Sequence, residues 1–429
     1  MAYDDSAFRR RDNSTTDRLG RDDFGPSAYE SSDYREPDTT ESTLGMHQHR
    51  RVPPAVLDDV FDDPDHGDPG RDRMVVHIVW EIVLLLAAGA AAYLVYSQDS
   101  SALRGAGLDS LLVLAAALGL LAIGVGLTLR AGAVNLAVGP IAAAAALHFA
   151  ENGDRGLVSA ALPAIGAAAV IGLALAILVA GFHVPGWAAS LGAGLAVVVF
   201  IQQRTESVTV QGDFDPTDRS IYIFGGVAAL GVLGGLLGTI KSVRRAVGRF
   251  RPVADPARRR GRVAGLLAGG AIVVSMILAA AGGILFAASS GTVTPDPGFD
   301  LLGLALGAAL LGGTSAFGRR GGVFGTVLAV VLLTLAIRYF DARNWNVSFY
   351  AIGAAAMTVG LVITRVVEAF GRPPSARVEP DPEWNGSAGS ETPAGWSSPR
   401  QESWSSALPA QPTAGRTDPW DGDRWGIAR

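Results

Sequence analysis

Ten apolar stretches between residues 75 and 370 constrain this chain more than any other feature. Each stretch is apolar on every face of a helix, whereas a helix of a soluble domain carries polar residues on one side. The hydrocarbon core of a bilayer, ~30 Å thick, needs about 20 such residues to be crossed. Ten of these stretches cannot all be interior in one soluble domain of this length. The pattern therefore predicts an all-α integral membrane protein with about ten transmembrane helices.

The predicted spans are 75–96, 108–129, 133–150, 157–181, 184–202, 220–240, 263–288, 299–317, 323–340 and 349–369. Spans 133–150 and 299–317 are short and rich in Gly and Ala, so each is compatible with a half-helix or a re-entrant segment. Together the spans form a transmembrane domain at 75–370, which has a polar segment on either side.

Charged residues in the gaps between the spans indicate how the chain is oriented. With the N-terminus inside, the inner gaps are basic, and Lys241–Arg262 alone has nine basic residues against one acid, Asp255. The outer gaps, together with the start of the span at 299–317, hold ten acids, Asp99 and Glu151 among them. Basic residues accumulate in short cytoplasmic loops. We therefore expect both termini in the cytoplasm and the protein in the cytoplasmic membrane.

The two polar tails, 1–74 and 371–429, contain mixed charges, Ser, Pro and Gly, and few aliphatic residues. Neither can bury enough apolar surface to fold alone, so we expect both to be disordered cytoplasmic tails. Two interpretations of the C-terminal tail stay open. It is either a simple polymer tail, or its tryptophans form a weak docking strip for a partner or the membrane interface. These tryptophans are Trp384, Trp396, Trp404, Trp420 and Trp425.

Motifs for catalysis are missing from the sequence. It has no cysteine, which excludes a disulfide framework and cysteine-ligated metal. It also lacks G-x-x-x-x-G-K-[ST], H-E-x-x-H and G-x-S-x-G, and the nearest phosphate-loop string, Gly238–Ser242, has no Gly-Lys pair. The histidines of the core, His77, His148 and His183, lie near predicted membrane faces. We therefore expect no enzyme and no bound cofactor or metal, and the small net charge of −5 gives no sign of a nucleic-acid partner.

Few ionisable residues fall inside the predicted spans. Glu81 lies within the first span, and Asp109, Arg338 and Glu368 lie near span ends, where long side chains reach the interface. Ion-driven transporters usually carry acids or histidines at mid-membrane depth. Secondary transport is therefore disfavoured.

Two glycine-marked interruptions break the apolar pattern. One, Arg130–Pro140, joins the second and third spans, and the other, Leu311–Gly322, joins the eighth and ninth. Because the basic loop lies between them, the chain is predicted to consist of two related halves, each with an interrupted helix pair. Such a pattern is typical of repeat-built transporters with a pathway at the repeat interface. The alternative is that the glycines only let helices pack closely, and the periodicity alone does not decide between the two.

Four segments carry a resemblance to a known family. Arg130–Gly139, RAGAVNLAVG, is similar to a "G-[IVF]-[DN]-[LI]-x-x-G" signature, and His183–Gly192, HVPGWAASLG, to a segment with the core "P-x-[FY]-[IV]-x-[TS]-L-G". Leu311–Thr326 contains LGGTS and GGVFGT, and Ala279–Ala288 precedes it in the expected order. Over about 120–368 the chain resembles the membrane permease subunit of ABC importers of the sugar, nucleoside and branched-chain amino acid superfamily.

The resemblance implies a permease subunit that forms the translocation pathway for a small polar solute. It implies ATP-binding subunits that hydrolyse ATP, a second permease subunit (identical or a sister chain) and an extracytoplasmic solute-binding protein as partners. Asn135, Thr314 and Ser315 are expected to lie near the pathway or to shape its breaks. A further set is expected in the loop that couples to the ATPase: Arg249, Arg258, Arg259 and Gly261.

The coupling loop departs from the family pattern, because Lys241–Arg262 lacks the expected Gly-Asn pair and carries extra Arg and Pro. A loop this basic could instead rest on anionic membrane lipid. Two other functions stay open: a secondary transporter or channel, and a non-transporting membrane scaffold that acts through its tails. The sequence does not identify the solute.

Overall fold

The computed structural model describes residues 74–248, 262–316 and 323–371. Apart from Met74 and Gly371, which end helices, the two predicted tails lie outside the described residues, as do four predicted coupling residues, Arg249, Arg258, Arg259 and Gly261. The described part is mostly helical, which confirms the predicted helical class.

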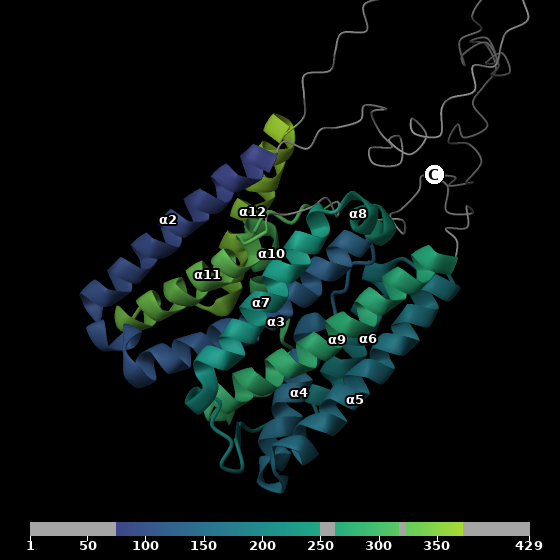
Figure 1. Cartoon of the computed structure of the whole chain (residues 1–429). Coiled ribbons are helices and arrows are strands. Elements are labelled where there is room, and N and C mark those ends of the chain that lie inside the picture. The colour runs from purple at the N-terminus through teal and green to yellow at the C-terminus, as the bar shows by residue number, and fades with distance from the viewer. Residues whose placement is uncertain (1–73, 249–261, 317–322, 372–429) are drawn as a thin grey trace, which may run out of the picture. The chain divides into compact units, whose positions relative to one another are not determined.

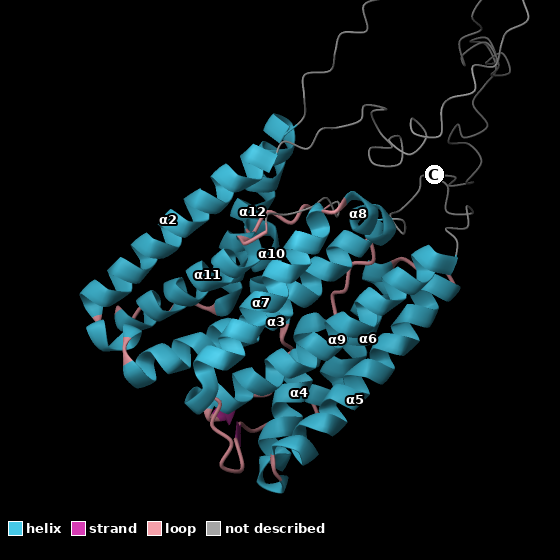
Figure 2. Cartoon of the chain, viewed as in Figure 1, coloured by secondary structure: helices cyan, strands magenta, loops and turns pink. Residues whose placement is uncertain are grey.

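The elements follow one another along the chain as Figures 1 and 2 show. They are α2 (Met74–Gln98), η1 (Ser100–Leu103), α3 (Gly105–Ala131), α4 (Val138–Asn152), η2 (Gly153–Arg155), α5 (Leu157–Ala176), the π-helical turn η3 (Ile177–Gly181), α6 (Gly186–Ile201), β1 (Val208–Thr209), η4 (Thr217–Arg219), α7 (Ser220–Thr239), α8 (Lys241–Gly248), α9 (Arg262–Ser290), β2 (Thr292–Val293), α10 (Phe299–Leu311), α11 (Gly325–Ala342) and α12 (Phe349–Gly371).

Seven of the described helices are long and apolar enough to span a membrane, which indicates a multi-pass membrane protein. They correspond to α2, α3, α5 with η3, α7 with η4, α9, α11 and α12. The predicted spans at 133–150, 184–202 and 299–317 correspond to shorter helices, α4, α6 and α10. Between α3 and α4 the chain is non-helical from residue 132 to residue 137, so α4 begins later than predicted. Helix α10 ends at Leu311, earlier than predicted. Both helices are therefore shortened at their glycine-marked ends.

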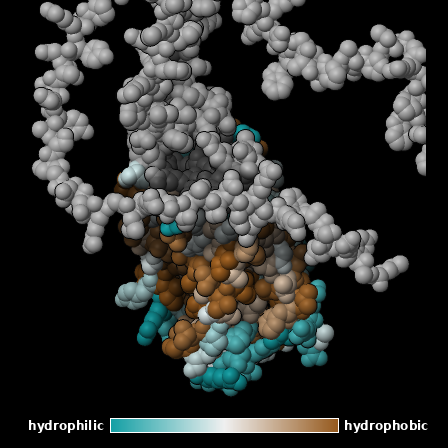
Figure 3. Space-filling view, turned by 90° about the vertical axis from the view of Figure 1, so that its right-hand side faces the viewer, coloured by the Kyte–Doolittle hydropathy of each residue, from teal (hydrophilic) through white to brown (hydrophobic). Residues whose placement is uncertain are grey.

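The outer surface of the described helices is apolar. On α7, for example, Tyr222 is 81% exposed and Leu233 57% exposed, and on α2 Leu86 is 68% exposed. On the face drawn in Figure 3, hydrophobic residues form a broad band above a hydrophilic cap. Exposure of such an apolar surface to water is unfavourable, whereas contact with the hydrocarbon of a membrane is not.

The core is built around α3, α4 and α9. Helix α9 packs against α3, α4 and α5, and most side chains of α4 are buried, including Leu147 and Phe149. Helices approach closely here because small residues line the contacts. At Gly283 of α9, a Cβ atom would overlap the backbone carbonyl of Ala142 in α4, so only glycine fits.

Two further helix pairs flank this core, α10 with α12 and α2 with α11. A two-stranded antiparallel ribbon, in which Val208 pairs with Val293 and Thr209 with Thr292, joins the loop after α6 to the loop after α9. In Figures 1 and 2 the ribbon lies at the end of the bundle opposite to α8, to the start of α2 and to the end of α12.

Candidate functional site

The first glycine-marked interruption is a sharp, non-helical turn between α3 and α4. Helix α3 ends at Gly132, which adopts the left-handed conformation (φ 71°) that favours glycine. The N–H groups of Gly132 and Ala133 donate to the carbonyls of Leu129 and Thr128. Two of the free carbonyls of the helix end are thereby satisfied where the chain turns inside the protein.

Asn135 fastens this turn to α9. Its side chain is 1% exposed, and its Nδ2 donates to the hydroxyl oxygen of Ser275 at 2.6 Å. Its Oδ1 accepts from the backbone N–H of Ala137 at 3.0 Å, which closes an Asx turn ahead of α4. Asn135 therefore sets both the shape of the turn and its distance from α9.

Ser190 of α6 holds the same turn from the other side. Its hydroxyl oxygen accepts from the backbone N–H of Leu136 at 2.9 Å and lies 3.2 Å from the carbonyl oxygen of Val134. The hydroxyl also lies 2.7 Å from the carbonyl oxygen of Gly186, one turn back in its own helix. Backbone groups that would otherwise be unpaired inside a membrane protein are thus bonded to side chains.

The second interruption follows α10. The backbone N–H groups of Gly313 and Thr314 donate to the carbonyls of Leu310 and Ala309 and close the helix end. Gly312 touches the backbone at the start of α11, and a Cβ atom on Gly325 would overlap the carbonyl of Gly312. The two ends of this interrupted pair therefore lie side by side.

Helix α2 bridges the second interruption through two adjacent side chains. The indole N–H of Trp80 donates to the carbonyl of Leu311 at 2.8 Å. A carboxylate oxygen of Glu81 accepts from the N–H groups of Phe324 and Gly325 at 2.7 and 3.1 Å. A negative charge at the N-terminus of α11 is favourable, because helix N-termini carry a partial positive charge. The sequence does not indicate a partner for Glu81. The signal that it does contain is an acidic residue within an otherwise apolar span.

The predicted pathway residues lie on two sides of α3. A Cβ atom on Gly124 would lie 3.2 Å from the backbone of Ser275, the partner of Asn135, and one on Gly126 would lie 3.9 Å from the hydroxyl of Thr314. Positions two apart on a helix point in nearly opposite directions. The structure thus places Asn135 and Thr314 near the same part of α3, and helix α3 separates them.

Thr314 and Ser315 are both buried, at 0% and 3% exposed. The Thr314 hydroxyl has no hydrogen-bond partner among the described residues, whereas Asn135 uses both of its polar atoms. A buried hydroxyl without a partner is unfavourable, so the second interruption leaves one polar side-chain atom unsatisfied among the described residues.

Two small cavities lie in the described helices, each of about 10 Å³, which is barely room for one water molecule. Both are lined by apolar side chains, such as Leu118 and Phe349 in one and Phe224 and Val330 in the other, apart from Thr326 in the second. Neither includes a predicted pathway residue.

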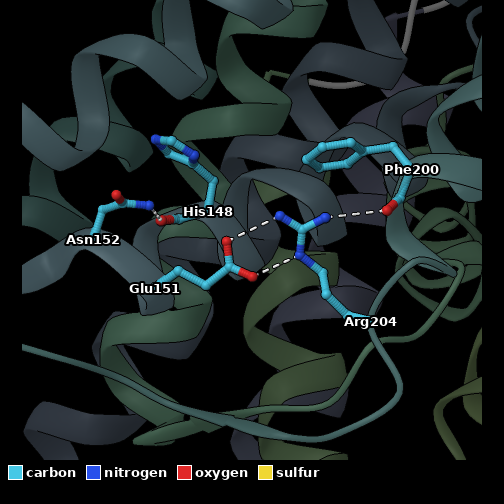
Figure 4. A network of polar contacts seen from close by, with 5 residues as sticks. All are labelled: His148, Glu151, Asn152, Phe200 and Arg204. Carbon is cyan, nitrogen blue, oxygen red and sulfur yellow. Dashed lines mark hydrogen bonds and ion pairs between the residues drawn. The ribbon is translucent and has the colours of Figure 1, made fainter.

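A polar cluster closes the far end of α4, as Figure 4 shows. Arg204 donates from Nε and Nη2 to the two carboxylate oxygens of Glu151, at 2.6 and 3.0 Å, and from Nη1 to the carbonyl of Phe200. These hydrogen bonds lower the pKa of the Glu151 carboxyl below its ordinary value. The imidazole Nε2 of His148, one turn away, is buried without a partner in the described part of the chain. Helix α4 is thus anchored at both ends.

Within the described ranges, no group of three or more His, Asp or Glu side chains is arranged to hold a metal ion. No protein-family model, no curated protein and no solved structure matches the chain. Function is therefore inferred from the site itself.

Proposed function

We propose that the chain is the permease subunit of an ATP-driven importer for a small polar solute in the cytoplasmic membrane. The observation that supports this best is the pair of hydrogen-bonded helix interruptions on opposite sides of α3. Irregular backbone at membrane depth is tolerated only where protein or water satisfies it. Transporters place such discontinuous helices around their solute site.

The proposal includes ten spans and two cytoplasmic termini, with α4, α6 and α10 as the short spans. The start of α2, the end of α12 and the basic helix α8 lie at the same end of the bundle (Figure 1), as an even number of spans requires. The acids Glu151, Asp215 and Asp296 belong to loops or helix ends on the other side of the spans in this topology. The charge asymmetry agrees with basic loops in the cytoplasm.

In this role the chain does no bond chemistry; it alternates between two states that expose one site to opposite sides. Asn135 and Ser190 bond the turn of the first interruption to α9 and α6, so it acts as the fixed wall of the pathway. The second leaves the Thr314 hydroxyl unpaired, and movement of α10 against α11 gives this hydroxyl water or a solute as its partner. Asn135 and Ser315 shape the interruptions on either side.

The partners follow from the family resemblance. A second permease subunit, identical or a sister chain, completes the pathway, and an extracytoplasmic solute-binding protein delivers a sugar, nucleoside or branched-chain amino acid. ATP-binding subunits dock at the Lys241–Arg262 loop, where Arg249, Arg258, Arg259 and Gly261 form the coupling surface. The two related halves of the sequence pattern supply one interruption each.

Thiol labelling tests the pathway without knowledge of the solute, because the chain contains no cysteine of its own. We expect Thr314→Cys, in membranes of the native cell, to react with a water-soluble thiol reagent at a rate that changes when ATP and vanadate are added. Thr334→Cys is the matched control, because Thr334 is also 0% exposed but its hydroxyl bonds Val330 within α11. If Thr314→Cys reacts no faster than Thr334→Cys in every nucleotide state, Thr314 does not line a pathway.

Co-purification tests the importer assignment separately. We expect a nucleotide-binding ATPase to accompany the gently purified chain, and the double variant Arg258→Glu, Arg259→Glu to lose it while the chain stays in the membrane. If no ATPase accompanies the intact chain, the importer assignment is wrong, and a non-transporting scaffold becomes the better explanation.

A further inference from the structure

Arg130, in the last turn of α3, has a guanidinium that the described protein leaves largely unpaired. Its Nη1 donates to the carbonyl of Gly234 in α7 at 3.3 Å, and its Nε is buried with no partner. The ion pairs among the described residues, Arg204 with Glu151 and Arg338 with Asp99, do not include it. A guanidinium offers five N–H donors, and burial without a counter-charge is costly.

The guanidinium lies at the edge of a lipid-facing surface. Only Ser220, Val227 and Gly235 are buried in α7, and near Arg130 the side chains of Leu236 and Leu237 are about half exposed. Gly238 leaves space for the guanidinium, since a Cβ atom there would lie 3.4 Å from Nη1. A Cβ atom on Gly234 would meet no protein atom within 4 Å, so this side of α7 is open.

Helix α8 begins directly after α7 and packs against α3, α7 and α9. Its sequence, KSVRRAVG, contains three basic residues, Lys241, Arg244 and Arg245. A short basic amphipathic helix next to an apolar surface is typical of a segment that lies in the membrane interface. Each basic residue near an anionic surface adds attraction to it.

We propose that Arg130 binds the phosphate of an anionic phospholipid in the leaflet on the α8 side of the membrane. The planar guanidinium matches two phosphate oxygens at once. The acyl chains lie along the exposed face of α7, and the basic sequence of α8 makes this end of the bundle attractive to an anionic headgroup. A free phosphate has the same oxygens but no apolar part for this face, so the lipid is the better occupant. The site does not depend on transport.

The test uses the purified full chain in a mild detergent, with measurement of the apparent melting temperature and of bound lipid by native mass spectrometry. We expect phosphatidylglycerol to raise the melting temperature by about 3 °C or more and to remain bound. Phosphatidylcholine and inorganic phosphate are expected to do neither. An equal shift with inorganic phosphate would overturn the lipid assignment in favour of a free-anion site.

Variants locate the site. Arg130→Gln should abolish the phosphatidylglycerol shift, and Arg219→Gln, the matched charge change at the other end of α7, should keep it. Gly234→Leu should also abolish the shift, because the leucine side chain blocks access of the lipid to Arg130. This second variant keeps Arg130 and favours the helix, so its result does not depend on whether Arg130→Gln folds. If Arg130→Gln and Gly234→Leu both respond to phosphatidylglycerol as the unmodified chain does, the proposal is wrong. Because no arm measures uptake or ATPase binding, this result is independent of the proposed function.

Discussion

The two helix interruptions differ in how they are held. The first lies between α3 and α4, and residues of the core fasten it: Asn135 bonds Ser275 of α9, and Ser190 of α6 bonds the turn itself. The second is held from the periphery, by Trp80 and Glu81 of α2. It also leaves a buried hydroxyl unpaired. Side chains of core helices thus fasten the first interruption, whereas the side chains that bond the second come from an outer helix.

The largest effect that separates the two interruptions is expected for alanine substitutions of their glycines. Gly325→Ala places a methyl group on the Gly312 carbonyl and should cost about 3 kcal/mol or prevent folding, since neither backbone can yield freely. Gly132→Ala only forces alanine into a left-handed conformation and should cost about 1 kcal/mol. Yield and thermal stability of the purified variants measure both. Equal losses would mean that the two interruptions are packed alike.

Removal of the α2 carboxylate should loosen the second interruption alone. Glu81→Ala leaves two N–H groups of α11 without their charged acceptor and should cost about 2 kcal/mol. Thermal melting measures how much stability is lost, and faster hydrogen exchange at the start of α11 shows that the loss is local to the second interruption. Glu206→Ala, on an exposed loop, is the control and should change neither. Faster exchange around residues 132–137 in the Glu81 variant would contradict the separation of the two interruptions.

A double-mutant cycle measures how firmly the first interruption is joined to α9. Asn135→Ala and Ser275→Ala should each destabilise the protein, and their coupling energy should be about 1 kcal/mol, since the two side chains bond directly. Ser289→Ala serves as the control on α9, because its hydroxyl bonds only its own helix at Phe286. Additive effects of Asn135→Ala and Ser275→Ala would show that the bond does not join the turn to α9.

The smallest effect is expected at the far end of α4 and depends on pH. Arg204 holds the pKa of Glu151 below its ordinary value, so the unfolded chain binds this proton more readily. The pair therefore stabilises the protein above the ordinary pKa of a glutamate, and the stabilisation is lost as pH falls through the lowered pKa. For a partly exposed pair the effect is below about 1 kcal/mol. As the pH is lowered from 7 to 3, the melting temperature of Glu151→Gln should fall less steeply than that of the unmodified chain. An equal slope for the two proteins would mean that the pair does not anchor α4.

Much of the helical layout could be predicted from the sequence. Helical class and the glycine-marked interruptions follow from local composition, because an apolar run and a left-handed glycine act within a few residues. The lengths of α4 and α10 could not be predicted: both stretches are apolar throughout, and the end of each helix depends on neighbouring helices that satisfy the turn. Asn135 and Thr314 are both buried beside the interruptions, and only the packing puts α3 between them.

The amino-acid sequence is enough to predict a multi-pass helical membrane protein and the places where its helices are interrupted. Which side chains complete those interruptions depends on how the helices pack. Asn135 reaches Ser275 across 140 positions, and Glu81 reaches Phe324 across 243. The physical reason is that a buried polar group must find a partner wherever packing brings one near. Chain position does not encode that proximity, whereas the apolar character of a helix is written in its own residues.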